Sequence, residues 1–291
     1  MYSEYPCPYG TPSGNFCLPT CVTSLNLISV INKSTQIVNN WLSLKLDRKP
    51  LSDAAAVRPL TSFPIKSIIQ DWLFPPTCLL CGDAGTAGRD LCLACFASLP
   101  FNLPACPRCA LPLPFETGIP CGYCQKHPPA YDRSLALFRY EEPVRHLIHA
   151  LKFQARYSCA RLMGDLLADK LVDLEEKPGA IIPVPLHPSR YRERGYNQSL
   201  EIARTLSNRL DIPLDYQSCT RVHATQAQTE LTAVQRRRNI KNAFAIAKPL
   251  TATHVAILDD VVTTGATVNE LAKVLRKAGA GRIDVWACAR A

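Results

Sequence analysis

Eight of the fourteen cysteines form four Cys-x-x-Cys pairs inside a block of 47 residues, from Cys78 to Cys124. A disulfide framework is unfavourable in a reducing cytosol, and four pairs in one block are not typical of a redox site. Structural zinc sites use paired thiolates of this kind, with four cysteines around each tetrahedral ion. The spacing therefore predicts two zinc sites. In sequential order the ligands are Cys78, Cys81, Cys92 and Cys95, then Cys106, Cys109, Cys121 and Cys124, with a cross-braced pairing as the open alternative.

The cysteine block divides the chain into three parts. Residues 71–130 carry the pairs among many prolines, so we expect a small double zinc ribbon of turns and hairpins whose folding depends on the metal. Residues 1–70 show no clear hydrophobic period, and we predict a poorly ordered extension there. Residues 131–291 form the third part, in which apolar runs alternate with amphipathic segments.

This third part has the pattern of an α/β domain. Strands that alternate with helices indicate a parallel sheet flanked by helices. Ligands of such sheets bind at the carboxyl ends of the strands. Strands are predicted at 133–140, 180–185, near 218–222, 254–258 and 282–289, and helices at 141–153, 197–210 and from Val268 onward.

The segment VAILDDVVTTGAT, residues 255–267, joins a buried strand to a helix through a loop of small residues. The backbone N–H groups of such a loop and the N-terminus of the helix together form a cradle for phosphate. The carboxylates of Asp259 and Asp260 fit a ligand that also carries hydroxyl groups or Mg2+. A Walker-type nucleotide site would need a Gly-Lys pair, and the chain has none. The segment therefore predicts a sugar-phosphate site.

This segment resembles the motif that binds phosphoribosyl pyrophosphate (PRPP) in type I phosphoribosyltransferases. Three further segments follow the cysteine pairs: IHALKF (148–153), VPLHPSRYRERGYNQS (184–199) and HATQAQTELTAVQRRRNIKNAF (223–244). Together they resemble the ComF (competence protein F, GntX-like) family over about residues 72–291. The resemblance implies a type I phosphoribosyltransferase-like domain preceded by a double zinc ribbon.

The resemblance also implies roles for single residues. Asp259 and Asp260 would be the catalytic acidic pair, in contact with the ribose hydroxyls and Mg2+. The basic loop after residues 180–185 would hold the pyrophosphate, with Gly195 relieving the turn and Asn197 capping the next helix. The 5-phosphate would be bound by Thr263, Thr264, Gly265, Ala266 and Thr267, and the pyrophosphate by Arg190, Arg192 and Arg194.

For two further basic segments, residues 223–244 and the helix at 141–153, the sequence predicts roles that are less specific. Residues 223–244 are expected to include a basic helix and to act as a mobile lid that closes over an anionic ligand. His149 and Lys152 lie on the polar face of the helix at 141–153. We expect these two side chains to make surface or interdomain contacts and not to act in catalysis.

Charge and hydropathy limit the class of partner. The chain has a net charge of +9, and residues 131–291 hold 24 Lys and Arg against 17 Asp and Glu. This excess favours an anionic partner, either a phosphorylated metabolite or a nucleic acid. No apolar run approaches the roughly 18 residues of a membrane helix. The first residues do not resemble a signal peptide, so we expect a cytoplasmic protein without a membrane span.

Two functions are consistent with these features. The resemblance implies a phosphoribosyltransferase that uses PRPP and an acceptor of unknown identity, linked to competence and the use of external DNA. The alternative is a non-catalytic module that binds PRPP or single-stranded DNA for the DNA-uptake machinery. The expected cofactors are two structural Zn2+ ions and Mg2+ with PRPP.

Overall fold

The computed structural model describes residues 75–223 and 240–291. All described residues belong to one unit of the chain, Thr61–Ala291. The predicted extension at 1–70 therefore lies outside the described residues. The domain boundaries at residues 70 and 130 remain predictions.

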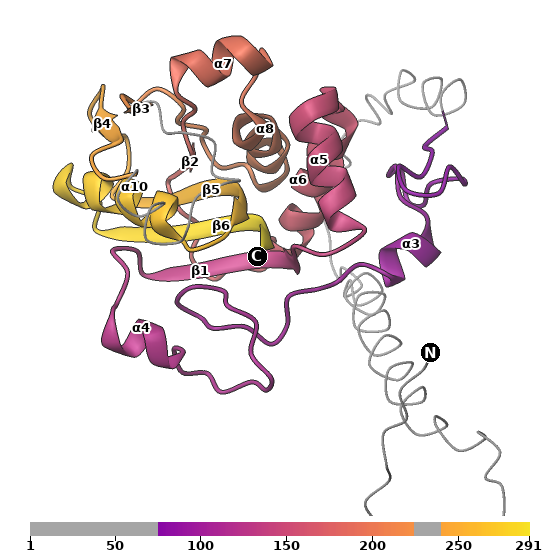
Figure 1. Cartoon of the computed structure of the whole chain (residues 1–291), viewed down its shortest axis with the longest axis horizontal. Helices are drawn as coiled ribbons and strands as arrows, with labels where there is room; N and C mark the ends of the chain where they lie inside the picture. The colour runs from indigo at the N-terminus through magenta and orange to yellow at the C-terminus, as the bar shows by residue number, and fades with distance from the viewer. Residues whose placement is uncertain (1–74, 224–239) are drawn as a thin grey trace, which may run out of the picture. The chain divides into compact units, whose positions relative to one another are not determined.

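A four-stranded parallel sheet forms the centre of the described part of the chain (Figure 1). Its strand order is β1-β6-β5-β2, so β6 and β5 lie between the two strands that precede them in the chain. Each strand coincides with a predicted apolar run, as is typical of strands buried on both faces. The bounds are β1 Arg133–Arg139, β2 Ala180–Pro183, β5 His254–Val262 and β6 Arg282–Arg290.

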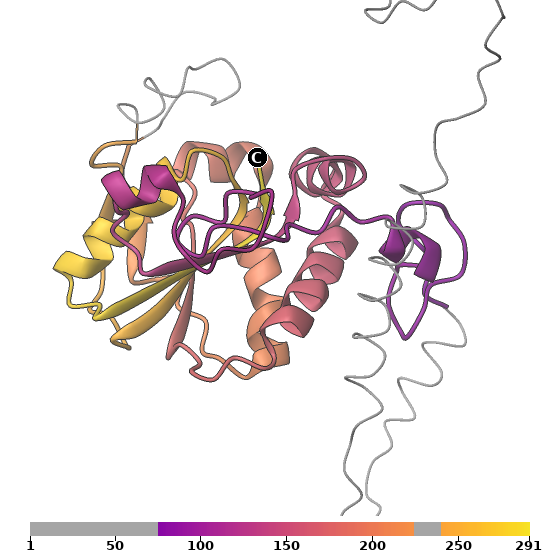
Figure 2. The ribbon, with the colours of Figure 1, turned by 90° about the horizontal axis from the view of Figure 1, so that it is seen from below.

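Helices cover both faces of this sheet (Figure 2). On one face lies α10, Ala266–Lys277, and on the other lies α8, Gln198–Leu210, packed against α6, Tyr157–Leu171. The helix α5, Val144–Gln154, follows β1 and packs on α6. This arrangement confirms the predicted α/β class with a parallel sheet and flanking helices. Among the described helices, none is long and apolar enough to cross a membrane.

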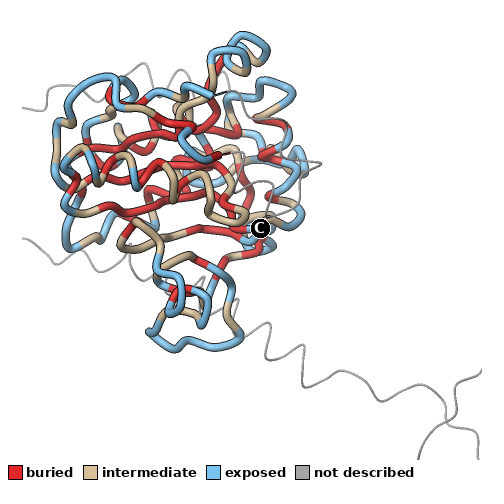
Figure 3. Tube along the Cα trace, turned by 60° about the vertical axis from the view of Figure 1, so that its left-hand side comes forward, coloured by how far each residue is buried: buried red, intermediate tan, exposed pale blue. Residues whose placement is uncertain are grey.

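Two apolar cores lie on the two faces of the sheet, and the strands between them are buried along most of their length (Figure 3). Alternate side chains of β5 contribute to different cores because successive residues of a strand point to opposite faces. Ala256 and Leu258 belong to the core formed with α5, α6 and α8. Val255 and Ile257 belong to the core formed with α10. The sheet is therefore a rigid support for the loops at its carboxyl edge.

The helix α6 was not predicted from the sequence. Nine of its fifteen residues are buried, so it lacks the broad polar face that marks an amphipathic helix. Gly164 lies where α6 approaches α8: a Cβ at this position would be 2.7 Å from the Cβ of Thr205. The glycine lowers the helix propensity of the segment but permits the close contact between the two helices.

The strand β5 is longer than predicted. It continues past Leu258 to Val262 because β6 pairs with it along this extension, with Asp259 opposite Ala287. The two aspartates therefore lie within the strand and do not follow it. Their backbone is held by the sheet, and their side chains point to opposite sides of the strand.

The three predicted arginines lie on a short helix and not on a loop. The helix α7, Pro188–Arg194, has proline at its first position, and His187 caps it by accepting a hydrogen bond from the N–H of Ser189 at 3.2 Å. Gly195 ends the helix with a φ of +83°. Glycine adopts this left-handed conformation without strain, as was predicted for a turn at this position. Asn197 caps α8 as predicted, accepting two backbone N–H groups of its first turn.

The segment 223–244 is described only at residue 223 and from residue 240 onward. Residues 240–242 form a turn, and Phe244 begins β4, Phe244–Ile246, which pairs antiparallel with β3, Cys219–Arg221. The predicted basic helix is therefore wrong at its C-terminal end, because pairing with β3 extends the backbone of Phe244. The rest of the predicted lid lies outside the described residues.

The cysteine-rich part contains two short helices, α3, Leu93–Ala97, and α4, Gly122–Lys126. Each begins directly after a cysteine, with Cys92 and Cys121 at the N-cap positions. Isolated bridges and turns connect these helices. The described part of this segment therefore has the short elements expected of a domain that depends on metal ions for its folding.

Candidate functional site

A pocket of about 590 Å3 opens at the carboxyl ends of β2 and β5. Its wall also receives residues from α5, α7, β3 and the first turn of α10, so segments far apart in the sequence meet there. Parallel sheets bind their ligands in this position. The wall includes residues 259–267 of the predicted motif, together with Val268.

The loop from Thr263 to Thr267 leads from β5 into α10, and all of its residues line the pocket. Gly265 has a φ of +74° and is the N-cap of α10; glycine enters this left-handed region without strain. The Oγ1 of Thr264 accepts a hydrogen bond from the N–H of Ala266 at 3.3 Å. The first N–H groups of a helix have no carbonyl partner within it, and the helix dipole is positive at this end. The loop can therefore bind an anion.

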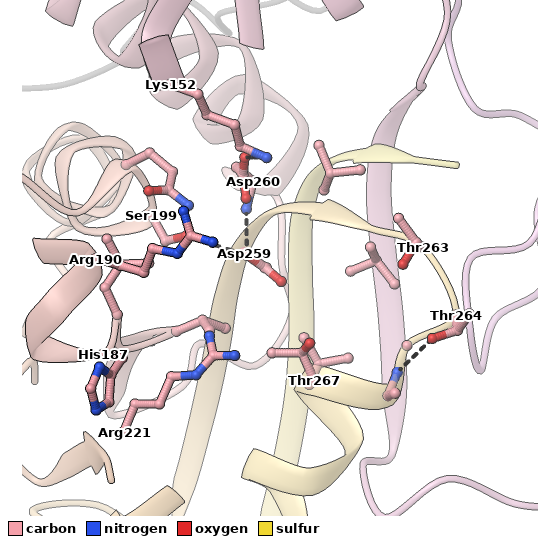
Figure 4. A pocket seen from close by; sticks show the side chains of 18 of the residues that line it. Lys152, His187, Arg190, Ser199, Arg221, Asp259, Asp260, Thr263, Thr264 and Thr267 are labelled. Carbon is pink, nitrogen blue, oxygen red and sulfur yellow. Dashed lines mark hydrogen bonds and ion pairs between the residues drawn. The ribbon is translucent and has the colours of Figure 1, made fainter. Parts of the chain in front are cut away.

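The acidic pair is buried at the floor of the pocket, with Asp259 8% and Asp260 3% exposed. The Oδ1 of Asp259 accepts hydrogen bonds from the backbone N–H of Asp260 at 2.9 Å and from the Oγ of Ser199 at 3.3 Å. The Nζ of Lys152 lies 2.5 Å from the Oδ2 of Asp260 (Figure 4). The two carboxyl groups thus have different partners.

These partners set different pKa values for the two carboxyl groups. Burial, together with the neighbouring charge of Asp260, raises the pKa of Asp259 to about 8. Burial also opposes ionisation of Asp260, but the Lys152 ammonium group outweighs it and lowers the pKa of that carboxyl group below its ordinary value. Asp260 is therefore the carboxylate whose charge Lys152 neutralises, whereas Asp259 favours its protonated form near neutral pH.

The prediction that Lys152 makes surface or interdomain contacts is wrong. Its side chain is 22% exposed and lines the pocket, so it is neither a surface nor an interdomain contact. Burial lowers its pKa, but the attraction of Asp260 is stronger and raises the pKa above the ordinary value. The neighbouring His149 is exposed as predicted, and its ring lies 4.7 Å from that of Phe153.

Two of the three predicted arginines, Arg190 and Arg194, line the pocket, whereas Arg192 is exposed and does not. Positions 190 and 194 are about one turn apart on α7 and share a face of the helix. Arg221, which the sequence did not single out, also lines the pocket from β3. In Figure 4, Arg190 and Arg221 extend toward Asp259 from the side opposite the threonine loop. The wall facing the loop is therefore cationic.

The eight paired cysteines form two clusters in sequential order, and within each cluster the sulfur atoms lie within 4.8 Å of one another. The geometry contradicts the cross-braced alternative. Backbone N–H groups support the thiolates: Cys95 donates to the Sγ of Cys92 at 3.4 Å, and Cys121 donates to the Sγ of Cys106 at 3.2 Å. Four clustered sulfur ligands of this kind fit tetrahedral Zn2+.

Comparison with known proteins agrees with the two cysteine clusters. The profile of the double zinc ribbon domain family matches residues 69–125. A parallel α/β domain follows, with the acidic pair and the small-residue loop at the carboxyl end of one strand. Fold and site together define a double-zinc-ribbon protein whose second part is a parallel α/β domain with a pocket at the carboxyl edge of its sheet.

The chain is 36% identical over 222 residues to "DNA utilization protein YhgH" of Salmonella typhimurium, which covers 74% of this chain and 97% of the relative. It is 38% identical over 223 residues to "Competence protein F" of Haemophilus influenzae, which covers 74% of this chain and 96% of the relative. The similarity extends over almost the whole of both relatives. The chain therefore belongs to the ComF (competence protein F) family.

One solved structure gives a weaker match. The hypoxanthine phosphoribosyltransferase of Staphylococcus aureus is 13% identical, with a TM-score of 0.29 over 45% of this chain and 72% of that one. A likeness at this level carries no argument about the ligand or the reaction. The description of the fold rests on the strand order and the helix packing of the chain itself.

Proposed function

We propose that the pocket binds PRPP together with Mg2+ and that the chain transfers the phosphoribosyl group to an acceptor. One observation carries the proposal. A buried acidic pair and a small-residue loop lie at the same end of β5, in one pocket whose opposite wall is cationic. A ligand with hydroxyl groups between two anionic groups complements this order of charges.

Each part of PRPP has a counterpart in the pocket. The loop of Thr263–Thr267 and the N-terminus of α10 would bind the 5-phosphate through backbone N–H groups. The acidic pair would accept hydrogen bonds from the ribose hydroxyls. Arg190 and Arg194 on α7, with Arg221, would bind the pyrophosphate. Arg192 has no part in this arrangement because it is exposed outside the lining.

The acidic pair also fits Mg2+. Carboxylate oxygens are preferred ligands of this ion, and it retains several waters when bound through one or two carboxylates. Lys152 already neutralises Asp260, whereas burial favours the protonated form of Asp259, so a bound cation would stabilise the carboxylate form of Asp259. Mg2+, when bound, would neutralise charge on the departing pyrophosphate. The side chain of Asp259 would orient the ribose by accepting a hydrogen bond from one of its hydroxyl groups.

In the proposed reaction the bond between ribose C1 and the pyrophosphate oxygen breaks, and a bond forms between C1 and the nucleophile of the acceptor. The electron pair of the broken bond leaves with pyrophosphate, so negative charge develops beside α7. Arg190 and Arg194 would stabilise this charge without transferring a proton. The residues lining the pocket would also exclude water, which otherwise attacks the activated sugar. The relatives named for DNA utilization and for competence lead us to place this activity in competence and DNA use.

A second candidate is a non-catalytic module that binds PRPP or single-stranded DNA. The exposed Arg192 of α7 favours it, because it could contact a phosphate beyond the pocket. The names of the relatives are consistent with it as well. The two candidates differ in what they require: the PRPP site needs Mg2+ and the acidic pair, whereas a DNA site needs several phosphate contacts.

The salt dependence of binding separates a PRPP site from a single-stranded DNA site. Between about 50 and 200 mM salt, the affinity for PRPP with Mg2+ is expected to fall less than tenfold, since one pocket holds the whole ligand. A single-stranded DNA site with several phosphate contacts would lose on the order of a hundredfold. Fluorescence anisotropy with labelled oligothymidine, with PRPP as competitor, measures both. Tight, strongly salt-dependent DNA binding without any PRPP binding would reject the transferase proposal.

A further inference from the structure

The two cysteine clusters contact different parts of the α/β domain. Around the first cluster, Arg89 forms an ion pair with Asp169 of α6, and Asp90 forms one with Arg161 of the same helix. These contacts lie on a helix that contributes no residue to the pocket wall. The second cluster is instead connected, through Arg290 of β6, to the end of β5 and the loop that follows it.

Arg290, at the end of β6, joins the second cluster to that loop. Its Nε donates a hydrogen bond to the carbonyl oxygen of Cys109 at 3.1 Å. Its Nη1 donates to the carbonyl oxygen of Val262 at 3.1 Å and also to that of Thr263. The side chain is buried, with 8% exposed. One guanidinium group therefore links a cysteine of the cluster to the first residue of the pocket loop.

The chain that leaves the second cluster supports the same loop from another direction. Arg108, inside the cluster, donates a hydrogen bond to the carbonyl oxygen of Tyr131 at 3.2 Å. Tyr131 is buried, and its hydroxyl oxygen lies 3.5 Å from where a Cβ on Gly265 would stand. The N–H of Ala130 donates to the Oδ1 of Asn269, in the first turns of α10, at 2.8 Å. Loop and helix are thus held at several points by residues of the second cluster or next to it.

We propose that the second cluster, with zinc bound, holds the Thr263–Thr267 loop in its ligand-binding conformation, and that Arg290 is the positioning residue. Loss of the metal frees the backbone of Cys109, so the guanidinium group of Arg290 loses its fixed acceptor. The loop carbonyl oxygens then lose a fixed donor. The first cluster has no such connection among the described residues, so its metal does not affect the loop. Only the ligand-binding readout of this inference rests on the proposed function.

The direct test changes Arg290 and leaves the cysteines intact. In the full chain, Arg290→Met is expected to keep two zinc ions, to speed amide hydrogen exchange across residues 262–268, and to weaken PRPP binding by roughly tenfold or more. Arg161→Met is the matched control because it removes a bond between the first cluster and α6. The control should leave exchange in the loop unchanged. Equal exchange in the two variants would overturn the proposal.

Cysteine variants test the role of the metal. Cys109→Ser/Cys124→Ser and Cys81→Ser/Cys95→Ser remove equivalent ligands from the second and first clusters, and each is expected to bind one zinc ion. Faster exchange at residues 262–268 is expected only in the variant of the second cluster, with melting curves confirming that both are folded. A loop that responds to both clusters or to neither contradicts the inference. If wild type shows no PRPP binding but the exchange pattern holds, the proposed function fails and the coupling stands.

Discussion

Removal of zinc from the full chain is expected to release two ions and to unfold residues 75–130. This segment has only five-residue helices, and its short elements give it little core of its own. In small zinc domains the metal supplies about 10–16 kcal/mol of folding free energy, and without it four thiolates are left crowded together. The parallel sheet has separate cores on both faces and should persist.

Two measurements check this result. A colorimetric zinc indicator during titration with a chelator counts the ions, and limited proteolysis locates the unfolded segment. The matched control is Cys288→Ala, a cysteine that is buried in the sheet and belongs to neither cluster, and it should retain both ions. A stoichiometry of one ion or none, or a cysteine-rich segment that resists proteases without metal, would contradict the prediction.

Replacement of Lys152 by methionine is expected to lower the free energy of unfolding by about 3 kcal/mol at pH 8, because the substitution leaves a buried carboxylate without its partner. The matched control, Lys273→Met, removes an exposed lysine from its pair with Glu270 and should cost less than about 1 kcal/mol. Denaturant unfolding at fixed pH measures both. A further replacement, Asp260→Asn in the Lys152→Met background, should restore part of the loss.

The direction of the pH effect follows from the pKa of Asp260. In the wild type this pKa is lowered, so the ion pair contributes stability above the unfolded pKa, and the contribution is lost as the pH falls through the folded value. Without Lys152, burial raises the pKa, and the carboxyl group can bind a proton at low pH. The difference between wild type and Lys152→Met should therefore shrink from pH 8 to pH 4. A difference that stays constant from pH 8 to pH 4 would show that Lys152 acts by packing alone.

Local patterns in the sequence predict much of this fold. The four central strands were visible as apolar runs, Gly195 marked a turn, and Asn197 marked the start of a helix. The spacing of the cysteines predicted both clusters, although the choice between sequential and cross-braced pairing required the structure. The helix α6 was not predicted because most of its residues are apolar and buried against α8 and the sheet. Its sequence therefore shows no broad polar face.

The pocket was predicted less completely, since its wall depends on contacts between distant segments. The motif at 255–267 was recognisable because its chemistry is contiguous. Lys152 and Arg221 reach the pocket only through the packing of α5 and the pairing of β3 with β4, which no local pattern reports. Lys152 had one signal, since it lies in IHALKF, a segment that carried the family resemblance. Arg192 was included because its neighbours are basic, but helix geometry turns it away.

The first measurement to make is a calorimetric titration of the zinc-loaded chain with PRPP, with and without Mg2+, on wild type, Asp259→Asn and Asp259→Asn/Asp260→Asn. The single variant keeps the ion pair of Lys152 with Asp260, so it separates ligand contacts from stability. We predict binding that depends on Mg2+, that is roughly a hundredfold weaker in Asp259→Asn, a change of about 2.7 kcal/mol, and that is lost in the double variant. No binding by folded wild type, or binding that neither Mg2+ nor the aspartates affect, would contradict the proposed site.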